Sequence, residues 1–550
     1  MAASVDTLNR RELLQSALNL LVAPEQFRDE NQLDQQICER LNQWRNNVTA
    51  ADDSNDSDNQ TDSANKGKLD PFIEGLPVEL QKLPVVRRLN RPQFQGYDAT
   101  FLREAVVLRD IAGHIQPEKR DDLSLAEAIF DWTVRNIQIQ PPPGSDATPA
   151  EQWVARHLPL ETVFFGQGSP LQRAWAFMLL ARQAGLDVVL LGLPDSRNLD
   201  QPRPWVTALA DGNDLYLFDF TYGLPIPGPN GEGIATLAQA AADDKILRQM
   251  DTADRPYPRK AADLQKVMAL LEASPGYLSP RIKDLEFRLS GNDRIVLGFD
   301  PAALADKLSK FKHIEAVKLW TFPFEVFQLR SDIPKDVLNA RYWERVPFSF
   351  NGEMETPSKK QGEQRAQEHQ VEALRLARYL QLRGMFGNTD EERPAKMRGK
   401  DLSEMMERGA KYYYLRAMPR DEEIKDFARM QRQGELLAGR PVTQEFVDAC
   451  QTVRDDAAYW LGVVWLELGS NKTASDYLGR MTLEADPNGR WANGARYNLA
   501  RAYEAMGKNA DAIRLYEADR SPQRYGNKLR AERLKTRETQ KQTKSAESKK

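Results

Sequence analysis

Cysteine and histidine are scarce in this sequence, which holds two Cys and four His among 550 residues. The two thiols, Cys38 and Cys450, stand far apart in the chain. That separation excludes a disulfide framework and the short ligand spacings of a metal site. Free Cys usually behaves as a small hydrophobic side chain, so we expect two buried thiols without a chemical role. The sequence indicates no metal and no cofactor.

Long apolar runs and an excess of one charge are also missing. No stretch approaches the 18 or so consecutive apolar residues that a membrane span requires. The 76 Lys and Arg nearly balance the 80 Asp and Glu, which argues against a dedicated nucleic-acid binder. The N-terminal stretch lacks the continuous apolar core of a secretory signal. A cytoplasmic location is therefore the default expectation, and export stays open if a leader precedes Met1 in the natural protein.

The length and composition instead predict a multidomain α+β protein. Residues 1–48 have helical periodicity and are predicted to be an N-terminal helical segment. Residues 49–69 carry a run rich in Asp with few apolar side chains, so we expect an acidic disordered linker. Residues 528–550 hold nine basic and three acidic residues and are predicted to be a basic disordered tail. A tether to nucleic acid or to an anionic surface is the alternative for this tail.

Residues 70–255 combine helical periodicity with strand-like runs and are predicted to be an α+β domain. The run 204–221 carries Asp211-Gly212 at its centre, which predicts a β-hairpin.

Residues 256–355 are predicted to be a small βαβ-like α/β module. Residues 294–300 are predicted as a strand, Asp300-Pro301 is typical of a helix start, and 316–330 is predicted as the returning strand.

The chain is predicted to be helical over 356–450 and to repeat over 451–527. The two repeats stand 38 residues apart and share a small residue for close helix crossing, a Gly for the turn and large residues for the interface. The matched positions are Leu461-Gly462 and Leu499-Ala500, Trp465 and Tyr503, Gly469 and Gly507, Ala474 and Ala512, and Leu478 and Tyr516. This pattern resembles tetratricopeptide repeats, whose arrays usually bind partners on a concave surface. An all-helical packing domain without a ligand is the alternative.

The stretch from Trp132 to Thr221 resembles the transglutaminase-like superfamily, which has a papain-like fold. Arg182 and Gly185 match the turn after the family's nucleophile helix, Trp205 matches its strand aromatic, and Asp219 with Thr221 matches its final motif. The resemblance implies a transglutaminase-like α+β domain at 70–255.

The same resemblance assigns the catalytic positions, and two of the three have lost their chemistry. The nucleophile position falls on Pro170, the base position on Arg203 and the orienting acid on Asp219. Proline has no nucleophile, and arginine stays protonated and cannot act as a base. In the family, the base is the His of a His-x-Trp motif that opens a strand. None of the four histidines here stands in that motif: His114, His157, His313 and His369. Ser169 is best placed as the helix N-cap before Pro170. A hydrolase that uses Ser169 with His157 is the alternative.

The degenerate cleft, with Arg203 and Asp219 at the former catalytic positions, has two candidate roles. An ion pair between Arg203 and Asp219 is the simplest expectation, because the family pattern puts them on adjacent strands. Alternatively, Arg203 lies beside the positive end of the Ser169 helix and, with Trp205, binds a carboxylate or phosphate group.

The sequence therefore predicts a non-catalytic, transglutaminase-like protein that binds a protein or peptide through its helical repeats and degenerate cleft. A peptidase or acyltransferase with a rearranged site is one alternative, and a structural component of a larger assembly is another. The oligomeric state is not indicated.

Overall fold

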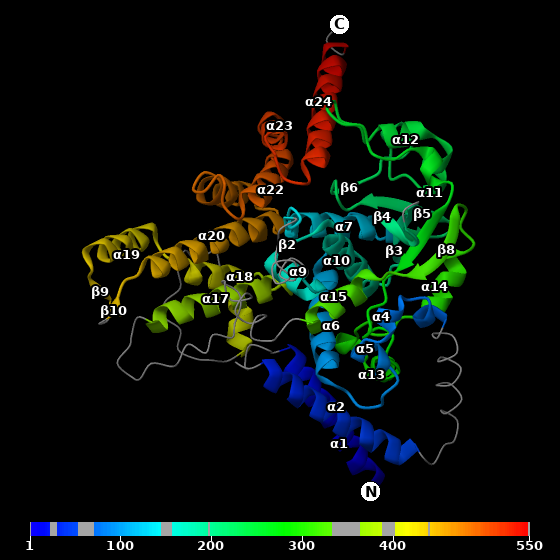
Figure 1. Cartoon of the computed structure of the whole chain (residues 1–550). Coiled ribbons are helices and arrows are strands. Elements are labelled where there is room, and N and C mark those ends of the chain that lie inside the picture. The colour runs from blue at the N-terminus through cyan, green and yellow to red at the C-terminus, as the bar shows by residue number, and fades with distance from the viewer. Residues whose placement is uncertain are drawn as a thin grey trace.

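The structure is a computed structural model (Figure 1) that describes residues 2–22, 30–52, 71–144, 157–195, 198–332, 364–387, 402–437 and 440–547. The predicted acidic linker lies outside the described residues from residue 53 to its end.

The centre of the molecule is a six-stranded mixed sheet in the order β6-β5-β4-β3-β7-β8. Its strands are β3 (Val188–Asp195), β4 (Asn198–Asp211), β5 (Asp214–Asp219), β6 (Leu224–Pro225), β7 (Val267–Leu271) and β8 (Ile314–Leu319). The strands from β6 to β7 pair antiparallel, and β7 pairs parallel with β8. The predicted hairpin is confirmed: β4 and β5 join at a turn in which Gly212 has a φ of 56°.

The predicted α/β module over 256–355 is not a separate body. Its two strands, β7 and β8, complete the sheet of the preceding domain. Residues 294–300 are not a strand, and the predicted strand over 316–330 ends at Leu319 and continues as α15 (Phe322–Asp332). The predicted helix start at Asp300 is confirmed, since its side chain accepts hydrogen bonds from the first turn of α14 (Pro301–Leu308). The chain runs from β7 through α13 and α14 to the parallel strand β8, which is a βαβ connection as expected. Its first strand, however, is β7 and not residues 294–300.

Helices cover both faces of the sheet because its inner strands alternate buried side chains to each side. On one face Leu190, Leu209 and Phe218 share a core with the helices. That layer contains α6 (Gly96–His114), α7 (Asp122–Asn136), α10 (Pro170–Gln183) and α13 (Pro280–Arg288). The other face packs on α4 (Val78–Gln81), α5 (Pro84–Arg87), α11 (Leu237–Ala242), α12 (Asp244–Arg248) and α14. Smaller elements are β1 (Gln138–Ile139), α9 (Pro159–Phe165), β2 (Gln167–Gly168), η2 (Pro229–Gly231), η3 (Ala261–Leu264) and η4 (Gly291–Asp293).

The N-terminal segment is two helices, α1 (Ala2–Val22) and α2 (Glu30–Asp52), which pack on α6. The side chain of Asn42 on α2 accepts from the backbone N–H of Phe94 at 2.8 Å and donates to its carbonyl at 3.1 Å. The predicted burial of Cys38 and Cys450 as free thiols is confirmed.

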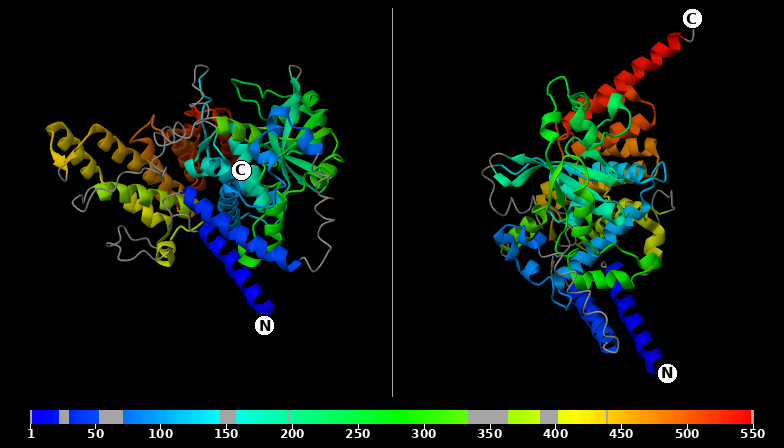
Figure 2. Two further views of the ribbon diagram at one scale, coloured as in Figure 1. Left: turned by 60° about the horizontal axis from the view of Figure 1, so that its bottom comes forward. Right: turned by 90° about the vertical axis from the view of Figure 1, so that its right-hand side faces the viewer.

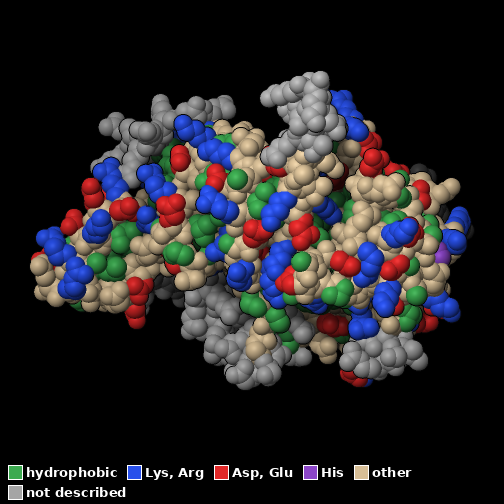
Figure 3. Space-filling model, turned by 90° about the horizontal axis from the view of Figure 1, so that it is seen from above, with side chains coloured by type: hydrophobic (Ala, Val, Ile, Leu, Met, Phe, Trp, Pro, Cys, Tyr) green, Lys and Arg blue, Asp and Glu red, His purple; other side chains and the backbone are tan. Residues whose placement is uncertain are grey.

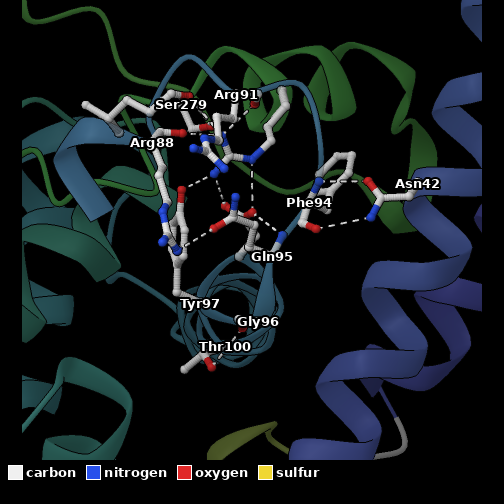
Figure 4. Close-up of polar contacts among 12 residues, drawn as sticks. Asn42, Arg88, Arg91, Phe94, Gln95, Gly96, Tyr97, Thr100 and Ser279 are labelled. Atoms are coloured by element: carbon white, nitrogen blue, oxygen red, sulfur yellow. Dashed lines mark hydrogen bonds and ion pairs between the residues drawn. The ribbon is translucent and has the colours of Figure 1, made fainter. Parts of the chain in front are cut away.

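A buried ion pair joins α6 to α13, beside Arg91, Gln95 and Tyr97 (Figure 4). Arg281 donates to both carboxylate oxygens of Asp98, at 2.9 and 2.8 Å, and both side chains are fully buried. The same guanidinium donates to the carbonyls of Leu89 and Arg91 and to the hydroxyl of Tyr97. One side chain therefore fixes the loop before α6 as well as α6 itself.

The C-terminal part is helical, as predicted. Its elements are α17 (Gln364–Leu382), α18 (Leu402–Ala417), α19 (Asp421–Gln433), β9 (Leu436–Leu437), β10 (Arg440–Pro441), α20 (Gln444–Glu467), α21 (Asn471–Ser475), the π-helix η5 (Asp476–Leu483), α22 (Ala492–Ala505), α23 (Asn509–Glu517) and α24 (Arg524–Glu547). The predicted boundary at residue 450 is wrong, because it cuts α20.

The two predicted repeats are two helical hairpins. Gly469 and Gly507 make the turns with φ values of 74° and 72°, which favour glycine. A Cβ at Gly462 would lie 2.6 Å from the Leu478 side chain, so the close crossing needs a residue without one.

The prediction of a disordered tail over 528–550 is wrong for most of that range, because α24 extends to Glu547. Leu529, Ala531 and Leu534 are buried on the rest of the chain, and the helix projects beyond the body at the opposite end from α1 (Figures 1 and 2).

One core cluster also crosses the predicted domain borders. Its contacting buried side chains run from Ala17 on α1 through Phe177 on α10 to Leu534 on α24. Other clusters are more local, and one of them lies mainly in the C-terminal helices.

Candidate functional site

Helix α10 begins as the sequence predicts. Ser169 is the N-cap and Pro170 the first helical residue. The Ser169 hydroxyl accepts from the Gln172 backbone N–H at 3.2 Å, and the Gln172 side chain accepts from the Ser169 N–H at 2.7 Å. Such a capping box satisfies two backbone donors that the helix leaves open. The Ser169 oxygen is therefore engaged in holding the helix end.

His157 lies near this helix end but is held by packing. Its ring stands edge-on to Phe165 with centroids 5.0 Å apart, and its Nδ1 lies 3.4 Å from the Gln167 carbonyl oxygen. Its own carbonyl accepts from the Gln172 side chain at 3.1 Å. These contacts favour a structural role over that of a base for Ser169.

A β-bulge decides where the strand residues point. Leu191 pairs with Val206 and the next residue, Gly192, pairs with Pro204, so Trp205 is an extra residue on β4. A bulge of this kind re-aims side chains. Trp205 packs in the core on the sheet face away from α10, and it does not share a cleft with Ser169.

Asp219 is buried in the same environment as Trp205. Its carboxylate accepts from the Tyr257 hydroxyl at 2.7 Å and from the backbone N–H groups of Thr221 and Tyr222 at 2.8 Å each. Trp205 in turn donates to the Tyr257 oxygen at 2.9 Å. Burial raises the pKa of Asp219, and these donors oppose the shift.

The expected pairing of Arg203 with Asp219 is not formed. Arg203 is exposed, whereas Asp219 is 3% exposed and its partner is Tyr257. The prediction placed the two residues on adjacent strands, but the pairing of β4 with β5 ends at Thr207 and Phe218, so Arg203 lies beyond the paired part of these strands.

We therefore expect Arg203 and Asp219 to respond differently to substitution. Asp219→Ala strips the acceptor from one hydroxyl and two backbone N–H groups and should cost about 2–4 kcal/mol. Arg203→Ala removes an exposed charge and should cost less than about 1 kcal/mol. Urea unfolding of both variants measures this, with Asp219→Asn as a control that keeps one acceptor oxygen. Equal losses in the two alanine variants would contradict this placement.

The cation at the start of α10 is Arg173, which the sequence analysis overlooked. Its side chain is 1% exposed. It donates to the carbonyls of Ile137 and Phe220, the latter at 3.2 Å, and to the Gln523 side-chain oxygen at 2.6 Å. An arginine inside an otherwise apolar helix was the signal in the sequence.

Gln523 comes from the segment before α24, so the C-terminal region contacts α10 at Arg173. A cavity of about 20 Å³ remains between them, large enough for one water molecule. Further hydrogen bonds and an ion pair link residues 131–138 to residues 467–501. Asn136 donates to Glu467, and Asn498 donates to the Arg135 carbonyl. The Gln138 side chain donates to the Arg490 carbonyl and accepts from the Gly494 N–H, and Arg501 pairs with Asp131.

Within the described ranges, no three His, Cys, Asp or Glu side chains are grouped to hold a metal ion, and no helix is long and apolar enough to cross a membrane. Comparisons with protein-family models, curated proteins and solved structures found no match to this chain.

Proposed function

We propose that this chain is a non-catalytic, transglutaminase-like protein that binds a protein or peptide partner through its helical region. The observation that supports it best is the start of α10. Pro170 occupies the position that the family resemblance gives to the nucleophile, and the buried Arg173 in the same helical turn is held by Gln523 of the C-terminal region. A site whose nucleophile position carries proline favours binding over catalysis.

The helical hairpins offer the surface for a partner. Leu468, at the turn of the first hairpin, is 42% exposed, and Leu436, between α19 and α20, is 59% exposed. Side chains of both charges are interspersed with hydrophobic ones over the face in Figure 3. A mixed surface of this kind fits a protein or peptide partner better than a polyanion. The proposed binding surface does not include the degenerate cleft, because Ser169, Arg203 and Trp205 do not line a common site.

The first test concerns catalysis. We expect no labelling of the intact chain by serine- or thiol-directed activity probes, because Ser169 caps a helix and burial raises the pKa of Cys38 to about 12 and that of Cys450 to about 11. Mass spectrometry of the probe-treated protein measures it. Stoichiometric labelling of Ser169 would establish the hydrolase alternative instead.

The second test concerns the binding surface. A partner captured on the immobilised intact chain should be lost with Leu468→Asp and retained with Phe287→Asp. Phe287 is 75% exposed and lies on α13, outside the helical region, so it is a matched control. Retention by the Leu468 variant together with loss by the Phe287 variant would place binding elsewhere and contradict the proposal.

A further inference from the structure

The small cavity at the start of α10 has an unusual lining. Two arginines, residues with side-chain amides and two residues with hydroxyl groups line it, and no Asp or Glu is among the described residues that line it. The polar groups around it include Arg135, Arg173, Asn493, Ser521 and Asn527.

Arg173 brings a buried charge to this cavity without a carboxylate in contact. Its hydrogen bonds go to the neutral oxygens of Ile137, Phe220 and Gln523. Burial lowers the pKa of its guanidinium to about 9, and Asp219 opposes this shift only from a distance. A charge removed from water is costly unless an opposite charge accompanies it.

The acidic groups nearest to the lining are engaged by other partners. Asp131 pairs with Arg135 at 2.9 Å and with Arg501 at 2.5 Å. Asp519 accepts from the Ser521 hydroxyl and from the Asn527 amide, both at 2.7 Å. Neither carboxylate contacts Arg173.

The ends of two long helices add positive potential. Asn493 and Gly494 belong to the first turn of α22, and Asn527 to the first turn of α24. The aligned peptide dipoles give the N-terminus of a helix a partial positive charge that attracts anions, while the Gly494 N–H itself donates to the Gln138 side chain at 3.0 Å.

We propose that this cavity binds one monovalent anion of the size of chloride, between Arg135 and Arg173 at the N-terminal ends of α22 and α24. The cavity, about 20 Å³ in volume, has room for one small ion. The bound anion compensates Arg173 and fastens the C-terminal helices to α10. This inference goes beyond the proposed function and does not depend on it.

Thermal unfolding of the full chain at constant ionic strength tests the proposal. Replacing gluconate stepwise by chloride should raise the melting temperature, because a ligand that binds only the folded state stabilises it by mass action. Bromide should act as chloride does, and gluconate, a bulky polyhydroxy carboxylate, serves as the reference anion. Identical melting temperatures in chloride and gluconate would overturn the proposal.

Asn493→Asp provides the matched variant. Asn493 is exposed at the rim of the cavity, so a carboxylate there should replace the anion, and the chloride-dependent shift should disappear while the protein stays folded. Asn292→Asp, at an exposed position on η4 far from the cavity lining, should keep the full shift. An unchanged shift in the Asn493 variant would show that chloride acts elsewhere.

Anomalous scattering from crystals grown in bromide locates the ion directly. We expect a peak between the Arg135 and Arg173 side chains. Peaks on the outer surface alone would overturn the proposal.

Discussion

Arg281→Ala should lower the free energy of unfolding by about 3–5 kcal/mol, as expected when one partner of a buried ion pair is removed. The substitution strands the Asp98 carboxylate, whose pKa burial already raises, and removes the donor from the carbonyls of Leu89 and Arg91. Urea unfolding measures the loss. Lys266→Ala is the control, because the Lys266–Glu315 pair at 3.1 Å has side chains 72% and 43% exposed. Such a surface pair contributes less than about 1 kcal/mol.

The double variant Arg281→Met with Asp98→Leu separates the stranded charge from the lost packing. It should recover a large part of the loss, because no buried charge remains. Recovery should be incomplete, since Asp98 also accepts from the Gln95 backbone N–H at 2.7 Å and so caps α6. If Arg281→Ala cost no more than Lys266→Ala, the pair would not be buried as described.

Local signals in the sequence were sufficient for the helix starts and turns. Ser169 and Pro170 begin α10, and Gly469 and Gly507 end the first helices of the two hairpins, each at its predicted place. These motifs act within about four residues, so no information from distant segments is needed.

The arrangement of the candidate cleft needed information that a single strand does not carry. The bulge at Trp205 appears only in the pairing of β4 with β3, and it places Trp205 on the sheet face away from α10. Arg203 lies beyond the last pair of β4 with β5 and is exposed, and Tyr257, far along the chain, is the partner of Asp219.

The composition of residues 528–550 likewise gave no indication of the helix α24. Averaged over the tail, basic and polar residues dominate, and this is typical of disorder. Leu529 and Leu534 are nevertheless buried, each in one of the two core clusters of the central sheet, and α24 packs on α23. Domain borders are hard to predict for the same reason, because burial across segments distant in sequence decides which parts share a core.

Glu104 should make the protein less stable as the pH rises. Its side chain is 9% exposed on α6, and burial raises the pKa of its carboxyl to about 8. The Leu160 backbone N–H, at 2.9 Å, and Arg330 oppose this shift, while Glu272 and Glu161 add to it. In the unfolded chain the carboxyl releases its proton near its ordinary pKa of 4.5. Between these two values the folded state alone retains the proton, so each pH unit costs up to about 1.4 kcal/mol of stability.

Glu104→Gln should remove this dependence, because the amide stays neutral and its oxygen can still accept from Leu160. Near pH 4.5 the variant and the natural protein should have similar free energies of unfolding, since Glu104 is protonated in both the folded state and much of the unfolded state. By pH 8 the variant should be more stable by about 2–4 kcal/mol.

Urea unfolding over this pH range measures the divergence of the two free energies, with Glu79→Gln, at an exposed position on α4, as the control. Other buried carboxyls, among them Asp98 and Asp219, titrate equally in all three proteins, so they cancel from the difference. Parallel curves for the natural protein and Glu104→Gln would mean that Glu104 is ionised at neutral pH and that Arg330 compensates its charge.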